Sequence, residues 1–274
     1  GAAHANVQPH PGAQDNTMKI DTPSLQTRLE QEGVGAKAHP WLPDCLQLEG
    51  TGDLERLGSY QEGLFYVQDA AARLAVLAGH FQPGMQVLDA CSAPGGKSFA
   101  AAIAMKGQGS ILSCDIHPHK IQLIEAGAAR LGLSCIHGQQ LDAKACKGEL
   151  LNRFDLVIAD VPCSGLGIIR KKPDIRYKEP GPLERLPQIQ GEILENVSGY
   201  VRPGGELIYA TCTLLERENE LVVRDFIDRY NNFTLVPLQL PGPFKDCGQE
   251  GMVTCWPHRH DTDGFFFAKL RGLS

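Results

Sequence analysis

The stretch Val87-Leu88-Asp89-Ala90-Cys91-Ser92-Ala93-Pro94-Gly95-Gly96-Lys97-Ser98 begins as a hydrophobic strand and runs into a glycine-rich turn. A strand that ends at such a turn is a common way to bring backbone close to a nucleotide-like cofactor. The end of the stretch resembles a phosphate loop, but that motif requires glycine at position 91, which is Cys91 here. The pattern G-x-G-x-x-G does not match either. We therefore expect a cofactor site that does not bind a nucleoside triphosphate.

Strands and helices alternate on both sides of this stretch. Strands are expected at 86–89, 109–115, 134–137, 154–160, 205–211 and 264–270, and helices at 68–78, 97–105, 118–131, 183–200 and 216–230. Alternation of this kind predicts an α/β fold with a doubly wound, mostly parallel sheet. Ligands of such sheets bind at the carboxyl ends of the strands, where Asp89, Asp115 and Asp160 fall.

Length and composition predict one large domain with a small appendage. The chain has 274 residues, 42% of them hydrophobic, which is enough for a sizeable core. We expect a disordered lead-in at 1–15, a small α+β subdomain at 16–80, which includes a short extended run at 17–20, and the large domain at 81–274. No apolar run reaches the roughly 18 residues of a membrane span, and no signal peptide is visible.

Cysteine spacing and charge narrow the possible partners. The nine cysteines are irregularly spaced and form no C-x-x-C pair, so we expect no metal site and a reducing cytoplasm. The net charge of −6 argues against nucleic-acid binding over the whole surface. A local basic cluster follows Cys163 and either is a solvated loop or contacts phosphate; it consists of Arg170, Lys171, Lys172, Arg176 and Lys178.

Two further carboxylates follow neighbouring strands. Asp115 ends the strand after Asp89, where a carboxylate can accept both ribose hydroxyls of an adenosine. Asp142 follows the next strand and could reach the adenine amino group. Each could instead be a helix cap, and the residues alone leave both possibilities open.

Two cysteines lie at the ends of predicted strands, in Asp160-Val161-Pro162-Cys163 and Ala210-Thr211-Cys212-Thr213. A thiolate that adds to carbon 6 of a pyrimidine makes carbon 5 nucleophilic enough to attack a methyl donor. Asp160 is placed to hydrogen-bond or protonate N3 of the ring. A second thiol, or water held by it, could remove the carbon-5 proton. The alternative is that both cysteines are structural and buried.

Three segments together resemble the RNA (cytosine-5) methyltransferases, and more closely the bacterial Sun/Fmu group that modifies small-subunit ribosomal RNA. They are DACSAPGGK at 89–97, DVPCSG at 160–165 and YATCT at 209–213. The resemblance extends from about Asn16 to the last residue and includes GLFYVQD at 63–69 and DTDGFFF at 261–267.

The resemblance implies a Rossmann-like class I methyltransferase domain with a small RRM-like subdomain before it. It implies that S-adenosylmethionine is bound by Cys91, Ser92, Ala93, Pro94, Gly95, Gly96, Lys97, Asp115, Asp142 and Asp160. It also implies that Cys212 is the nucleophile and that Cys163 assists breakdown of the adduct. Lys97 would orient the ring or stabilise charge. Full-length members usually carry a helical NusB-like domain, so this chain is expected to be a fragment or a member that lacks it.

The sequence thus predicts a monomeric enzyme that makes 5-methylcytosine in RNA, with small-subunit ribosomal RNA preferred over transfer RNA. A catalytically silent RNA-binding protein on the same fold is disfavoured because Asp160, Cys163 and Cys212 are all present. Methylation of an exocyclic amine would need no thiol, and such enzymes usually carry an Asn- or Asp-Pro-Pro-aromatic motif.

Overall fold

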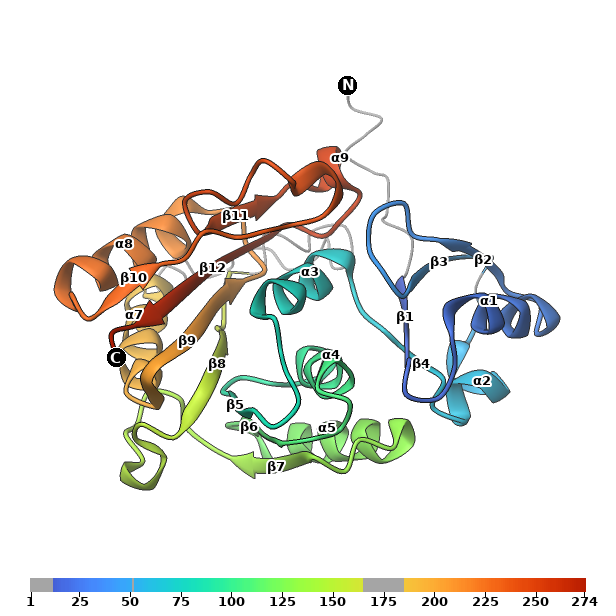
Figure 1. The fold of residues 1–274 in the computed structure, drawn as a ribbon, viewed down its shortest axis with the longest axis horizontal. Helices are drawn as coiled ribbons and strands as arrows, with labels where there is room; N and C mark the ends of the chain where they lie inside the picture. Colours follow the sequence, from blue (N-terminus) through green and yellow to red (C-terminus); the bar gives the residue numbers. More distant parts are fainter. Residues whose placement is uncertain (1–11, 51, 165–184) are drawn as a thin grey trace.

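The computed structural model describes residues 12–50, 52–164 and 185–274. The chain forms a small four-stranded sheet and a larger eight-stranded sheet, each with its own helices (Figure 1). No helix in these three ranges is both long and apolar enough to cross a membrane.

The larger sheet has the strand order β10-β12-β9-β8-β5-β6-β7, with β11 paired to β12. Neighbours from β9 to β7 run parallel, whereas β10, β11 and β12 add an antiparallel edge. The strands are β5 (Gln86–Asp89), β6 (Ser110–Asp115), β7 (Ile136–Gln140), β8 (Phe154–Asp160), β9 (Val201–Thr211), β10 (Phe233–Leu235), β11 (Met252–Cys255) and β12 (Phe265–Gly272). The strand order changes direction at β5, which confirms the predicted doubly wound α/β fold.

Helices cover both faces of this sheet, and a separate core fills each face. On one face lie α3 (Ala70–Gly79), α4 (Gly96–Ala104) and α5 (Pro118–Leu131); on the other lie α7 (Leu186–Ser198) and α8 (Glu220–Arg229) (Figure 1). Shorter helical turns are η3 (Gly148–Leu150), η5 (Glu216–Glu218), η6 (Gly242–Phe244) and α9 (Pro257–His260). The inner strand β8, with the sequence FDLVIAD, is largely apolar because both of its faces are buried.

The small sheet is entirely antiparallel, in the order β2-β3-β1-β4. Its elements are β1 (Gly12–Asp15), α1 (Thr22–Gln31), β2 (Gly35–Ala38), β3 (Cys45–Glu49), η2 (Leu54–Arg56), α2 (Gly58–Gln61) and β4 (Phe65–Val67). Leu25 and Leu29, four residues apart on α1, pack with Leu46 and Phe65 of the sheet, and all four are fully buried.

Three expectations for this small unit need correction. Residues 12–15 were expected in a disordered lead-in, but they form a strand at the centre of the small sheet; 1–11 lie outside the described residues. The expected extended run at 17–20 is a turn, because the amide N–H groups of Lys19 and Ile20 both donate to the carbonyl of Asn16. The small unit was expected at 16–80, but helix α3 packs on α4, β9 and β12 of the large domain, so the small unit ends before α3.

The two units are joined by hydrogen bonds to the C-terminal end of α5. The Asn16 side chain donates to the carbonyls of Gly63 and Leu131, both at 2.9 Å. Arg130 donates in return to the carbonyls of Tyr60 and Phe65, at 2.7 and 2.9 Å, and lies over the Tyr60 ring. These buried and half-buried bonds hold the small unit against the C-terminal end of α5.

Candidate active site

The glycine-rich turn connects β5 to α4 at the point where the sheet changes direction. Gly95 has φ +110° and precedes the helix, whose first N–H groups receive no side-chain cap. A Cβ at Gly95 would meet the Phe99 ring at 2.8 Å, so the turn depends on glycine for both its conformation and its space. The uncapped N–H groups face the carboxyl edge of the sheet, where they can bind an anionic group.

Asp89 lies beneath this turn, and its side chain does not line the carboxyl edge of the sheet. It is fully buried and accepts a hydrogen bond from Ser98 at 2.7 Å, while Ser98 also contacts the hydroxyl of Ser113 at 2.6 Å. Burial raises the pKa of Asp89 to about 6, and the bond from Ser98 opposes this effect. Asp89 therefore ties β5 to α4 and β6.

Lys97 and Asp160 form an ion pair in front of the turn. Lys97 lies in the first turn of α4 and Asp160 ends β8, the strand next to β5. Their side chains are 12% and 27% exposed, so the pair is largely shielded but still open to a ligand. The Lys97 ammonium also lies 5.2 Å from the centre of the Phe265 ring. The structure thus brings together two residues that the sequence assigned to one site.

The other two carboxylates lie further along the same edge. Asp115 ends β6, is half-buried, and accepts a bond from the His117 N–H at 3.0 Å. Asp142 follows β7, is exposed, and accepts from the Lys144 N–H at 3.0 Å. Each therefore has one backbone partner in a local turn and keeps oxygen atoms available to a ligand.

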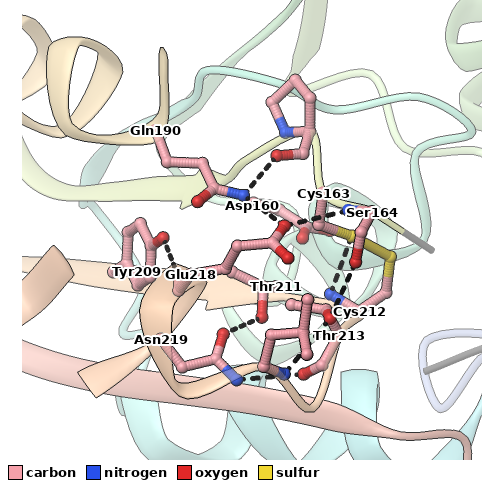
Figure 2. The surroundings of a disulfide bond; sticks show 12 residues. Asp160, Cys163, Ser164, Gln190, Tyr209, Thr211, Cys212, Thr213, Glu218 and Asn219 are labelled. Carbon is pink, nitrogen blue, oxygen red and sulfur yellow. Dashed lines mark hydrogen bonds between the residues drawn. A yellow bond between two sulfur atoms is a disulfide. The ribbon is translucent and has the colours of Figure 1, made fainter. Parts of the chain in front are cut away.

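The two cysteines lie in adjacent loops after β8 and β9. Their Cα atoms are 6.4 Å apart, and the structure joins Cys163 and Cys212 in a disulfide (Figure 2). The Cys212 N–H also points at Sγ of Cys163, at 3.3 Å. The two loops therefore bring the cysteines that the sequence singled out close enough for their sulfur atoms to bond. Neither residue is deeply buried, unlike the structural cysteines Cys114 and Cys255.

Cys91 in the glycine-rich turn differs from this pair. It is half-buried and packs against the core under α7 and α8. Burial is the main reason that its pKa is raised, and Asp160 and Asp89 add to the effect. A thiol held neutral in this way suits contact with a ligand better than nucleophilic attack.

Three buried polar side chains near the cysteines were missed by the sequence reasoning. Gln190 of α7, Glu218 at the end of η5 and Asn219 before α8 are each at most 1% exposed. Figure 2 shows all three pointing at the cysteine loops. The only available signal was a polar run, RENE at 217–220, before an expected helix, and it does not reveal which loops these side chains reach.

A cavity of about 790 Å³ opens beside the ion pair, between the small unit and the glycine-rich turn. Its lining includes Lys97 and Asp160 from the large domain, Tyr66 of β4 in the small sheet, and Gln68, which follows β4. The cavity has the volume of a small-molecule or nucleotide site. Across the described ranges, no group of three or more His, Cys, Asp or Glu side chains is placed to hold a metal ion. The basic cluster at 170–178 lies outside those ranges.

Comparison with known proteins places this site in a family. A family profile described as 16S rRNA methyltransferase RsmB/F matches residues 76–271. A probable ribosomal RNA small subunit methyltransferase B of Bacillus subtilis is 37% identical over 261 residues, which cover 93% of this chain and 58% of that protein. A ribosomal RNA small subunit methyltransferase F of Shewanella loihica is 30% identical and covers 96% of this chain and 57% of its own length.

A solved structure agrees with these relatives. The crystal structure of a methyltransferase homologue from Pyrococcus horikoshii superposes with a TM-score of 0.82 and 29% identity, over 99% of this chain and 89% of that one. The chain spans less than two thirds of the two bacterial relatives. The match over most of this chain confirms the resemblance predicted from the three motifs: the chain belongs to the RsmB/F family of 16S rRNA methyltransferases.

Proposed function

We propose that this chain transfers a methyl group from S-adenosylmethionine to carbon 5 of a cytosine in RNA, through a covalent adduct with Cys212. Small-subunit ribosomal RNA is the proposed substrate, because the curated relatives carry that substrate in their names. The observation that carries the proposal is the meeting of two cysteine loops with the Lys97–Asp160 pair at the switch point of the sheet.

The residues around the glycine-rich turn fit the proposed cofactor. The segment from Cys91 to Lys97 supplies a close backbone approach, and the uncapped start of α4 suits the cofactor's carboxylate. Asp115 would accept the ribose hydroxyls and Asp142 the adenine amino group, since both keep free carboxylate oxygens on the same edge. When bound, the cofactor supplies an electrophilic methyl group.

The chain's own residues account for the remaining chemistry. The Cys212 thiolate would form a bond to carbon 6 of cytosine, and the ring electrons shift to carbon 5. For this step Asp160, positioned by Lys97, would have to carry a proton, which it donates to N3 as negative charge develops on the ring and takes back when the adduct breaks down. After methylation, Cys163 or water held by it would take the carbon-5 proton. The C6–S bond then breaks, the ring regains its double bond, and Cys212 is released as thiolate. Both cysteines must be reduced for these steps.

Further features support the wider proposal. The small four-stranded unit lines the cavity beside Asp160, which supports a part for this RRM-like unit in RNA binding. We also propose that the chain acts as a monomer. Catalysis by two free thiols fits a reducing cytoplasm. The target base would have to leave its stack to reach the cysteines, as is usual for base-modifying enzymes.

The test is nucleoside mass spectrometry of unmodified small-subunit ribosomal RNA, incubated with S-adenosylmethionine, a reductant, and the wild type or one of three variants. Cys212→Ala should yield no 5-methylcytidine, and Cys163→Ala should yield little and accumulate a covalent protein–RNA adduct. Cys146→Ala is the matched control, because Cys146 is a free, exposed cysteine in another loop. Methylation by Cys212→Ala would contradict the assigned nucleophile, and a parallel reaction with transfer RNA tests the substrate.

A further inference from the structure

The neighbouring residues Glu218 and Asn219 each form hydrogen bonds with one of the two loops that carry Cys163 and Cys212. Glu218 ends η5 and Asn219 directly precedes α8, and both are buried. Figure 2 shows the Glu218 side chain directed at the loop of Cys163 and the Asn219 side chain at the loop of Cys212. Neither touches a sulfur atom, so any influence on catalysis must pass through the loops.

Glu218 holds the residues on both sides of Cys163 with the help of Gln190. Its Oε1 accepts the Ser164 N–H at 2.9 Å and the Gln190 amide at 2.9 Å. The same Gln190 amide nitrogen donates to the carbonyl of Pro162 at 2.8 Å. The residue before Cys163 and the residue after it are therefore fixed by one connected pair of buried side chains.

Asn219 holds the residues on both sides of Cys212 without an intermediary. Its Oδ1 accepts the Thr211 hydroxyl at 2.5 Å, and its Nδ2 donates to the carbonyl of Thr213 at 3.0 Å. A bond between the hydroxyls of Ser164 and Thr213, at 2.9 Å, also links the two loops to each other. Each cysteine is thus bracketed by its own anchor, and the anchors are consecutive in the chain.

We propose that Glu218 and Asn219 are positioning residues with separate tasks: Asn219 sets Cys212 for attack on the base, and Glu218, with Gln190, sets Cys163 for breakdown of the adduct. The division rests on the proposed function, because it takes the roles of the two thiols from it. A buried hydrogen bond to a charged or backbone group keeps a loop in one conformation, and its loss allows the sulfur to move by more than the tolerance of bond formation.

The division predicts opposite effects on a covalent intermediate. Asn219→Ala should slow formation of the protein–RNA adduct about 10-fold and accumulate none. Glu218→Ala should form the adduct at close to the wild-type rate but release it about 10-fold more slowly, so that adduct accumulates as in Cys163→Ala. Glu218→Gln keeps the carbonyl acceptor for Ser164 and should restore release to within about 3-fold of wild type.

The measurement follows adduct and 5-methylcytidine over time on denaturing gels and by mass spectrometry, under reductant. Two matched controls lie in the small unit. Glu32→Ala removes a carboxylate that accepts the Ser59 N–H, and Gln26→Ala removes an amide that donates to the carbonyl of Ala36. Both remove a half-buried side-chain hydrogen bond to the backbone of the small unit, so neither should change the ratio of adduct formation to adduct release. The same ratio of adduct formation to adduct release in Glu218→Ala and Asn219→Ala would overturn the proposal.

A second readout does not depend on methylation. Phenylarsine oxide binds two neighbouring thiols through two As–S bonds and releases water, so its affinity reports how the reduced cysteines are held. Both alanine variants should bind it about 10-fold more weakly than wild type, whereas Glu218→Gln and the two controls should bind it normally. If wild type fails to methylate RNA, the proposed function is wrong, and the arsenical still decides whether the anchors hold the thiols. Unchanged affinity in both alanine variants would contradict the anchoring itself.

Discussion

Lys97 and Asp160 form an ion pair that joins the first turn of α4 to the end of β8, across the point where the sheet changes direction. Asp160→Ala should lower kcat at least about 100-fold, because N3 of the cytosine ring loses its proton donor. Lys97→Met should lower kcat less, by about 10-fold, because the carboxylate remains but is no longer held in place. Single-turnover methylation of RNA measures both effects.

Asp155 provides the control for these two variants. It lies near the other end of β8 and forms an ion pair with Arg202 at 2.7 Å. Asp155→Asn should change stability but leave kcat close to the wild-type value. An equal loss of activity in Asp155→Asn and Asp160→Ala would mean that general disturbance of the strand, not chemistry at N3, explains the defect.

The Cys163–Cys212 disulfide predicts that the enzyme is active only after reduction. Protein oxidised in air should show no RNA adduct, and dithiothreitol should restore adduct formation, because Cys212 cannot supply a thiolate while it is bonded to Cys163. Cys163→Ala cannot form this disulfide, so its rate of adduct formation should be the same before and after reduction. Full activity of wild type whose disulfide is proven intact by mass spectrometry would refute the assigned roles of both cysteines.

The sequence predicted the large domain well because its elements are locally consistent. Strand β5 and helix α5 have the expected bounds, since apolar periodicity and a proline or glycine mark their ends. The rule that ligands bind at the carboxyl ends of parallel strands then placed Lys97, Asp160 and the two cysteines together. Such a rule works from topology and needs no knowledge of individual contacts.

The small sheet and the cysteine anchors could not be predicted in this way. Strand β1 has the sequence GAQD, which has no alternating pattern, and it forms because β3 and β4 pair with it on both sides. Gln190, Glu218 and Asn219 reach loops that are 6 to 54 residues away in the chain. Contacts of this kind depend on how α7 and α8 pack, and no local pattern encodes their partners.

Asp115→Ala should weaken binding of S-adenosylmethionine by about 10- to 100-fold, because two hydrogen bonds from ribose hydroxyls to a carboxylate are lost. The measurement is isothermal titration calorimetry with the cofactor alone, which separates binding from RNA methylation. Asp228→Ala, on the exposed end of α8 away from the glycine-rich turn, is the control and should bind normally. Unchanged affinity in Asp115→Ala would leave its bond to the His117 N–H as its only role.

Gly63→Ala should disturb the contact between the small unit and α5. Gly63 has φ +72°, and a Cβ there would lie 2.0 Å from the carbonyl oxygen of Arg130. Gly33→Ala is a matched control within the same unit, because its φ of +83° is equally unfavourable but its Cβ would meet nothing within 4 Å. The free energy of unfolding should fall by roughly 1–3 kcal/mol more for Gly63→Ala than for Gly33→Ala. Equal losses in urea unfolding would show that backbone conformation alone sets the cost.

Asp15 should make the protein less stable as pH rises from about 4 to 7. Burial raises the pKa of Asp15 from 3.8 to about 7; the Thr22 hydroxyl opposes this, whereas Asp44 and Asp21 add to it. The folded chain therefore binds the proton more tightly than the unfolded chain. The stability that this group provides is complete below the unfolded pKa and is lost as pH rises through the folded pKa. Asp15→Asn should remove this fall in stability with rising pH, and at pH 8 it should be more stable than wild type.

Asp21, in the same small unit, should change the pH dependence of stability in the opposite direction to Asp15. Its pKa is lowered by the bond from Ser24 at the start of α1, so its stabilising contribution is lost as pH falls, not as it rises. Thermal unfolding of wild type, Asp15→Asn and Asp21→Asn across pH 3 to 8 should therefore give slopes that change in opposite directions for the two variants. A wild-type slope that persists in Asp15→Asn would mean that another buried acid, such as Asp89, controls the pH dependence.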